Sequence, residues 1–115
     1  MITIRSNPER GRFELFDADA DAVIGKAAYV DDVGAAQRIF YHTEISEEYG
    51  GRGLAGVLAA QALDETVAAG LMIVPVCPYI KKYLAKHPGY AANVLAPTPA
   101  HLEIVRASLA QRVRQ

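Results

Sequence analysis

The chain has 115 residues, of which 51% are hydrophobic and 22% charged, and its formal net charge is −1 at pH 7. This length fits a single domain over residues 1–115. The balanced charge offers no clustered basic surface, which argues against nucleic acid as a partner. One cysteine cannot form an internal disulfide, no signal-peptide pattern opens the chain, and the longest apolar run, residues 71–80, is too short to span a bilayer. We therefore expect a cytoplasmic protein without membrane contact.

The first part of the chain predicts antiparallel strands. Short runs with alternating apolar residues are separated by turns rich in glycine, asparagine and aspartate. The expected strands cover residues 2–4, 12–16, 23–30 and 37–45. In the last strand, the two-residue period places Phe40, His42 and Glu44 on one face. The alternate residues, Tyr41 and Ile45 among them, fall on the other face.

A glycine-rich turn, a helix and a buried strand follow. Residues 48–53 read Glu-Tyr-Gly-Gly-Arg-Gly, and apolar, mostly small residues recur at helical spacing over residues 54–69. This pattern indicates a helix packed closely on a sheet. The dense apolar run over residues 71–76 is typical of a strand buried on both faces. Because proline cannot donate to a strand ladder, Pro75 and Pro78 predict that this strand leaves its neighbour early.

The last part of the chain predicts two further helices. Residues 79–87 form a short helical pattern stopped by proline and glycine, whereas residues 90–96 fit either a last strand or an extended segment. Thr98 and Pro99 are residue types that begin helices, and they open an extra C-terminal helix over residues 97–114. Its expected apolar stripe consists of Leu102, Val105 and Leu109. This helix should pack on the sheet or on a partner chain, which leaves a homodimer open.

The glycine turn ahead of a helix is the first candidate site. Glycines let the backbone approach a ligand, and the first N–H groups of a helix have no intrahelical partner, so together they bind anions. Residues 51–56 are a literal G-x-G-x-x-G, but the next strand ends without the acid that holds a dinucleotide ribose, and no Gly-Lys-Ser/Thr follows. A phosphate-bearing ligand is the first hypothesis. A turn that only reverses the chain is the alternative.

Four short motifs together resemble one family. They are His42-Thr43-Glu44-Ile45, Gly51-Arg52-Gly53-Leu54-Ala55, Val74-Pro75-Val76-Cys77-Pro78-Tyr79 and His87-Pro88-Gly89-Tyr90. The second resembles the Arg/Gln-x-x-Gly-x-Gly/Ala motif of the GNAT acetyltransferase superfamily, although Gly50 stands where the superfamily usually has arginine or glutamine. The whole string is similar to the small, single-domain YjdJ-type branch with its Cys-Pro-Tyr motif. The resemblance covers about residues 10–95 and not the last helix.

The resemblance implies a fold and a ligand. The fold is α+β, with a mixed, mostly antiparallel sheet, a central helix after the glycine loop and a C-terminal helix. Acetyl-coenzyme A (acetyl-CoA) would lie between two diverging strands, with its pyrophosphate on main-chain N–H groups. The implied cofactor-binding residues are Ile45, Gly51, Arg52, Gly53, Leu54, Ala55 and Gly56.

Two residues are candidates for the chemistry of acetyl transfer. Transfer to an amine needs a base for the amine, a donor for the developing oxyanion, and a proton for the departing thiolate. His42 changes charge near neutral pH and is the candidate base, with Glu44 to orient it or to act in its place. Cys77 directly precedes a helix N-terminus, which stabilises a thiolate, and in the YjdJ-type branch it is suspected of acting with the strand histidine. Tyr83 matches the leaving-group acid of larger relatives only with altered spacing, so core packing is its expected role.

No metal ion is expected. No cluster of histidine, cysteine, aspartate and glutamate has the spacing of metal ligands. His87 and His101 flank helices and should lie at the surface. Three lysines after the buried strand fit either contacts with the adenosine phosphates or a solvated helix face. They are Lys81, Lys82 and Lys86.

The preferred function is that of an N-acetyltransferase, which moves an acetyl group from acetyl-CoA to an amine of a protein, peptide or polyamine. Only a turn separates the first two strands, so the helices that cover the acceptor in larger GNAT proteins are missing there. The acceptor side should therefore be open. The alternative, from a different class, is a coenzyme A-binding module that acts through a protein partner without turnover. A structural adaptor with no ligand is the third hypothesis.

Overall fold

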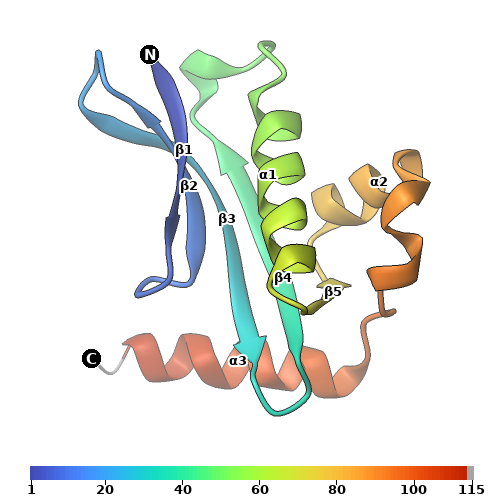
Figure 1. The fold of residues 1–115 in the computed structure, drawn as a ribbon. Coiled ribbons are helices and arrows are strands. Elements are labelled where there is room, and N and C mark those ends of the chain that lie inside the picture. Colours follow the sequence, from blue (N-terminus) through green and yellow to red (C-terminus); the bar gives the residue numbers. More distant parts are fainter. Residues whose placement is uncertain (114–115) are drawn as a thin grey trace.

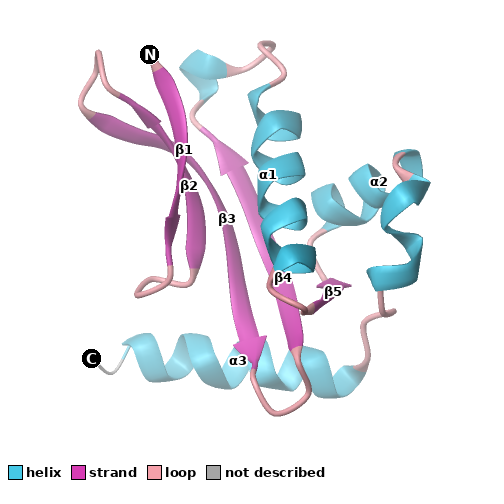
Figure 2. Cartoon of the chain, viewed as in Figure 1, coloured by secondary structure: helices cyan, strands magenta, loops and turns pink. Residues whose placement is uncertain are grey.

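A five-stranded sheet carries helices on both of its faces in the computed structural model, which describes residues 1–113 (Figures 1 and 2). In chain order the elements are β1 (Ile2–Asn7), β2 (Arg12–Asp17), β3 (Ala22–Asp32), β4 (Gln37–Ile45), the 3-10 helix η1 (Glu47–Tyr49), α1 (Leu54–Ala68), β5 (Met72–Pro75), α2 (Pro78–Lys86), the 3-10 helix η2 (Pro88–Asn93) and α3 (Pro99–Val113). The strands follow the order β1-β2-β3-β4-β5, and every neighbouring pair is antiparallel except β4 and β5. The predicted α+β class with a mostly antiparallel sheet is confirmed.

Helices α1 and α2 cover one face of the sheet and close the main core (Figure 1). In α1, Ala59 and Ala62 are fully buried beside Leu58 and Leu63. Alanine at these positions lets the helix axis approach the strands closely. The main core consists of Phe13, Leu15, Ile24, Ala27, Tyr29, Phe40, Leu58, Ala59, Ala62, Leu63, Ile73, Cys77 and Ile80.

The parallel strands β4 and β5 separate after a short ladder. Their register runs from Gln37 opposite Met72 to Phe40 opposite Pro75 and then ends. The N–H groups of Val76 and Cys77 both donate to the Phe40 carbonyl, at 3.0 and 2.9 Å. Because Pro75 has no N–H group, the ladder cannot continue regularly past it. From Tyr41 onward the β5 side of β4 has no strand partner within residues 1–113, so the predicted early departure is confirmed.

A β-bulge in β4 corrects the expected distribution of side chains. Ala28 of β3 pairs with His42, but the next residue, Tyr29, pairs with Phe40, so Tyr41 is an extra residue in β4. Such an insertion reverses the alternation beyond it. Phe40 and Ile45 consequently pack on the same core under α1, whereas the alternation predicted them on opposite faces.

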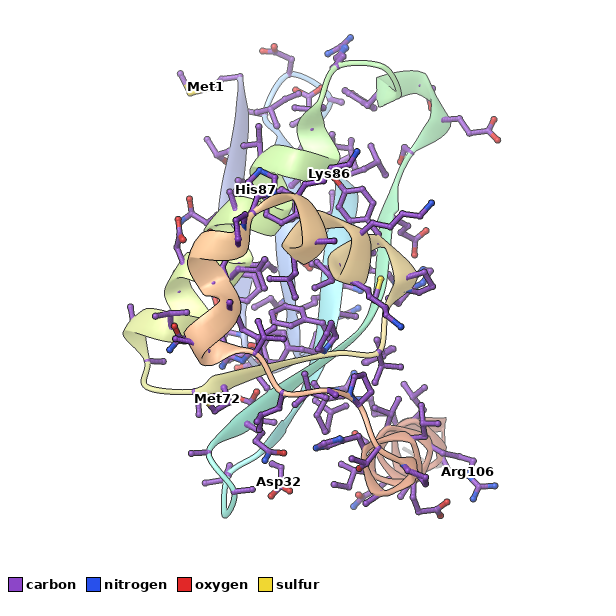
Figure 3. All side chains as sticks on the ribbon, turned by 90° about the vertical axis from the view of Figure 1, so that its right-hand side faces the viewer. Met1, Asp32, Met72, Lys86, His87 and Arg106 are labelled. Carbon is purple, nitrogen blue, oxygen red and sulfur yellow. The ribbon has the colours of Figure 1, made fainter. Side chains whose placement is uncertain are left out.

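Helix α3 crosses the other face of the sheet. Val105 packs there against Val30, Ile39 and Val74, and Figure 3 shows α3 end-on, near Arg106, on the opposite side of the sheet from α1. The predicted apolar stripe was wrong in two members, because Leu102 and Leu109 are 54% and 37% exposed. The stripe that meets the sheet runs instead through residues 101, 104, 105 and 108, the i, i+3, i+4, i+7 pattern of one helix face.

His101 is buried, not at the surface as predicted, with 8% of its area exposed. The Thr98 N–H donates to its Nδ1 at 3.0 Å, so Nε2 carries the proton and donates to Gln37 Oε1 at 2.8 Å. The Thr98 hydroxyl in turn accepts from the His101 N–H at 3.4 Å, as a helix cap does. These bonds satisfy the ring and attach the start of α3 to β4.

The segment over residues 90–96 does not form the predicted last strand, and only its end, after Asn93, is extended. It begins in η2, which ends at Asn93, and then forms a single parallel bridge between Val94 and Ile73 of β5. The Leu95 N–H donates to the Ile73 carbonyl at 2.9 Å. This single bridge and hydrogen bond attach the segment to the outer edge of β5 without forming a further strand.

The stability contribution of α3 can be tested with a matched pair of substitutions. We expect Val105→Ala to lower the free energy of unfolding by about 1.5–2.5 kcal/mol, because it removes two buried carbon atoms and leaves a void. We expect Leu102→Ala to lower it by less than about 0.5 kcal/mol, because that side chain is exposed. Chemical denaturation followed by circular dichroism measures both. Equal losses would contradict the described packing of α3.

Candidate functional site

The glycine turn between η1 and α1 holds two residues in a left-handed conformation. Gly51 has φ of 80° and Gly53 has φ of 72°, values that only glycine adopts without strain. Gly53 is also the N-cap of α1, and no side chain caps this helix end. A Cβ atom added at either glycine would meet no atom within 4 Å. The turn therefore leaves open space directly over the start of α1.

The main-chain N–H groups of this turn have no acceptor in the described part of the chain. Within residues 1–113, none of the N–H groups of residues 51–56 donates a hydrogen bond, and the first to do so is Val57, to the Gly53 carbonyl at 3.3 Å. These donors lie at the positive end of the α1 dipole. A row of free N–H groups at such an end fits a phosphate group, so the turn suits the anion that the sequence predicted.

A chain of side-chain contacts fixes the glycine turn to the sheet. The Tyr49 hydroxyl donates to Asp17 at the end of β2, and the Arg52 guanidinium lies 5.0 Å from the centre of the Tyr49 ring. The hydrogen bond from Tyr49 lowers the pKa of Asp17, and the same bond raises the pKa of Tyr49. Arg52 is thus held beside the free N–H groups by an aromatic ring that is itself anchored. Nothing in the local sequence pattern indicated Tyr49 or Asp17.

Aromatic residues of α2 lie close to the first turn of α1. The Tyr79 hydroxyl lies 3.8 Å from the place where a side chain on Gly56 would begin. Tyr79 and Tyr83 both pack on the main core, as does Ile45 at the end of β4. Burial raises the pKa of Tyr79, and the neighbouring Tyr83 adds to this effect. The expected role of Tyr83 was core packing, and its contact with the main core agrees with this expectation.

Cys77 lies at the point where β5 leaves β4. Only 3% of its area is exposed, and its thiol donates to the Thr43 hydroxyl at 3.5 Å. Pro78 then begins α2. Cys77 and Thr43 therefore lie on the α1 side of the sheet, Thr43 on β4 and Cys77 just after β5, on either side of the gap between the two strands.

His42 lies on the opposite side of the sheet from Cys77. Its Nε2 is 3.2 Å from Glu44 Oε1, and Lys26 Nζ is 3.3 Å from the same oxygen. The hydrogen bond from Lys26, reinforced by its charge, holds the pKa of Glu44 below the ordinary value. About half of the His42 side chain is exposed, at 52%. The hydrogen bonds of residues 1–113 therefore group His42 with Glu44 and Cys77 with Thr43, and none joins His42 to Cys77.

These features define a class of protein. A mixed sheet whose parallel pair diverges beside a glycine turn and an uncapped helix is the arrangement of an N-acetyltransferase domain, as the sequence resemblance implied. The sequence matches the GCN5-related N-acetyl-transferase family over residues 12–94. Since this match covers most of the chain, the protein belongs to that family.

Individual relatives agree with this assignment. Protein NATD1 of Gallus gallus and of Homo sapiens are each 45% identical to this chain over 47 residues, which is 41% of this chain and 43% and 42% of theirs. The chain thus spans less than half the length of these curated relatives. The solution structure of a GCN5-like protein from Staphylococcus aureus has the same fold, with a TM-score of 0.60 and 24% identity over 86% of this chain and 93% of that one.

Family membership confirms the predicted GNAT superfamily. The assignment to the YjdJ-type branch stays a prediction. Among the helices of residues 1–113, none is both long and apolar enough to cross a membrane.

The anchor of the glycine turn can be tested through its pH dependence. Because the folded-state pKa of Asp17 is lowered, its bond to Tyr49 stabilises the protein above the ordinary aspartate pKa of about 3.9 and loses this effect as the pH falls through the lowered value. We expect Tyr49→Phe to lower the denaturation midpoint at pH 7 and to have progressively less effect in acid. Tyr41→Phe is the control, and its effect should not depend on pH. If Tyr49→Phe lowered the denaturation midpoint as much in acid as at pH 7, the bond between Tyr49 and Asp17 would not be what holds the turn.

Proposed function

We propose that the protein transfers an acetyl group from acetyl-CoA to an amine. The observation that carries this proposal is the set of free N–H groups of residues 51–56 at the positive end of α1, beside a gap between parallel strands. The pyrophosphate would bind these N–H groups, with Arg52 adding positive charge. The pantetheine arm would run along Ile45 and the free edge of β4, where main-chain groups can pair with its amides.

His42 would act as the base that accepts the proton of the amine. If its Nε2 donates to Glu44, its Nδ1 keeps a free lone pair for that proton. Glu44 orients the ring and remains ionised, because Lys26 keeps its pKa low. The amine nitrogen then attacks the thioester carbonyl, a C–N bond forms and the C–S bond breaks. The departing thiolate of coenzyme A takes up one proton.

Cys77 would act on the other side of the gap. Its sulfur could attack the thioester and carry the acetyl group while coenzyme A leaves as the thiol, after which the amine attacks the acetyl-cysteine. In direct transfer, it would only lie beside the coenzyme sulfur. The contact with Thr43 places the thiol at the gap, which suits either route.

The acceptor site is proposed to be open. A turn over residues 8–11 joins β1 to β2, so the connection itself contains no helix, and α3 reaches it through Arg112, which lies against Gly11. An open site by its shape alone would exclude neither the amines of a protein or peptide nor a polyamine. A homodimer stays a prediction, and α3 is engaged with its own sheet.

A matched pair of glycine substitutions tests coenzyme binding. Gly53 and Gly70 have φ of 72° and 77°, and a Cβ atom at either would meet no protein atom within 4 Å. Alanine should therefore cost about 1 kcal/mol of stability at both positions. We expect Gly53→Ala alone to weaken coenzyme A binding, by at least about tenfold in calorimetry, because its methyl group occupies the space over the N–H groups.

Equal affinities of both variants and the wild type for coenzyme A, or no binding of coenzyme A to the wild type, would contradict the proposed site. Tight binding with no release of thiol from acetyl-CoA on any amine would favour the binding-module alternative instead.

Two further variants test the chemistry. We expect Cys77→Ala to abolish any acetyl-enzyme detected by intact mass after incubation with acetyl-CoA. We expect His42→Ala to slow transfer by about 10²-fold or more, the usual contribution of a general base, without weakening coenzyme binding. Thiol release and calorimetry measure the two effects separately. Rates unchanged in both variants would remove both residues from the mechanism.

A further inference from the structure

A small cavity lies on the open half of the sheet, on the His42 side. Its volume is about 250 Å³, and its lining includes Arg12, Lys26, Glu44 and Ser46. Helix α3 packs on the same face but at the other end of the strands, near Val30. The cavity is therefore not covered by any described helix, and it adjoins the pair formed by His42 and Glu44. Ligand sites for drug-sized molecules begin at roughly 300 Å³, so this cavity suits a smaller molecule.

Arg12, which lines the cavity, also neutralises a buried carboxylate next to it, that of Glu14. Glu14, 3% exposed, accepts from Arg12 Nε at 2.7 Å and from Asn7 at 3.2 Å, and Arg5 Nε lies 3.5 Å from its other oxygen. Burial raises the pKa of Glu14, but these hydrogen bonds and the charges of Arg12 and Arg5 outweigh it and leave the pKa lowered. Within residues 1–113, Arg12 uses only Nε in this way, so its terminal nitrogens are available to the cavity.

The rim of the cavity carries a free acceptor beside a second cation. Lys26 and His42 both approach Oε1 of Glu44, at 3.3 and 3.2 Å, and no side chain of residues 1–113 bonds to Oε2. Among the residues that line the cavity, Arg12 and Lys26 are positively charged and Glu44 is negatively charged. The cavity thus has one positive charge in excess, with a single carboxylate oxygen open.

We propose that the amine acceptor is a small zwitterion of the free amino-acid type, whose carboxylate binds Arg12 and Lys26 and whose amino group meets Glu44 beside His42. This refinement rests on the proposed acetyl transfer. A carboxylate is complementary to the free nitrogens of Arg12 and to the lysine ammonium. The amino group arrives as an ammonium ion, and His42 takes its proton before the nitrogen attacks the thioester. A polyamine, which carries only positive charge, would be repelled by Arg12 and Lys26.

The test compares amines that differ only in the carboxylate. Glycine, L-alanine and L-lysine are assayed against glycinamide, L-alaninamide and L-lysinamide, with spermidine as the polycation, by thiol release from acetyl-CoA. We expect kcat/KM to be at least about tenfold higher for each acid than for its amide, and spermidine to be a poor acceptor. Equal rates within the pairs, or spermidine as the best acceptor, would overturn the proposal.

The variant chosen is Lys26→Gln, because Arg12 also neutralises buried Glu14 and its removal would endanger folding. A role of Lys26 that was only structural would lower the rates with acids and amides alike. Because Lys26 also holds Glu44, we expect Lys26→Gln to lower the rates with both, but the rate with acids by at least about tenfold more, so that the acid-to-amide ratio falls toward one. Arg10→Gln, an exposed change in the β1–β2 turn, is the control and should keep the wild-type ratio.

Binding without turnover separates this inference from the proposed function. Glycine and glycinamide are titrated into ¹⁵N-labelled protein, and the amide signals of Gly25 and Lys26 are followed. Shifts with glycine but not with glycinamide support the cavity as an amino-acid site even if no amine is acetylated, in which case only the acetyl transfer is wrong. No shift with either compound overturns the inference, whatever coenzyme A does at the glycine turn.

Discussion

The separation of β4 from β5 is the constraint on which the rest of the structure depends. The N–H groups of Val76 and Cys77 both donate to the carbonyl of Phe40. Beyond Phe40, the edge of β4 on the β5 side has no strand partner within residues 1–113. A main-chain edge without a partner is costly inside a core, because each polar group must find water or a ligand. The glycine turn lies at the end of β4, and α1 then returns to β5. The loop therefore places its free N–H groups at the wide end of the same gap.

An anion site made of N–H groups works only if the loop that carries them is held still. The two left-handed glycines make the turn possible but add freedom to the unfolded chain. The contact of Tyr49 with Asp17 and the stacking of Arg52 on Tyr49 offset this freedom by attaching the turn to β2. Preorganisation of this kind lowers the cost of binding, since less order is imposed when the ligand arrives. The sheet thus helps to hold the glycine turn in place.

Local patterns in the sequence were enough to predict the four antiparallel strands, the glycine turn and the early end of β5, because alternation, glycine and proline act on neighbouring residues. They could not reveal contacts between distant parts. Asp17 and Tyr49 are 32 positions apart, and His101 is buried because Gln37, 64 positions away, supplies a partner for its ring. The bulge at Tyr41 also escaped prediction, because it is defined by the register with β3 and not by β4 alone.

That bulge decides which chemistry each face of the sheet can hold. With regular alternation, His42 would point to the same side as Phe40, into the core that α1 closes, and could not meet an acceptor from solvent. The extra residue turns His42 and Glu44 outward and turns Thr43 inward to Cys77. A thioester on the α1 side and an amine on the open side would then approach each other through the gap, with β4 between their binding sites. In the proposed function, the inserted residue in β4 would therefore allow one strand to contact two ligands at once.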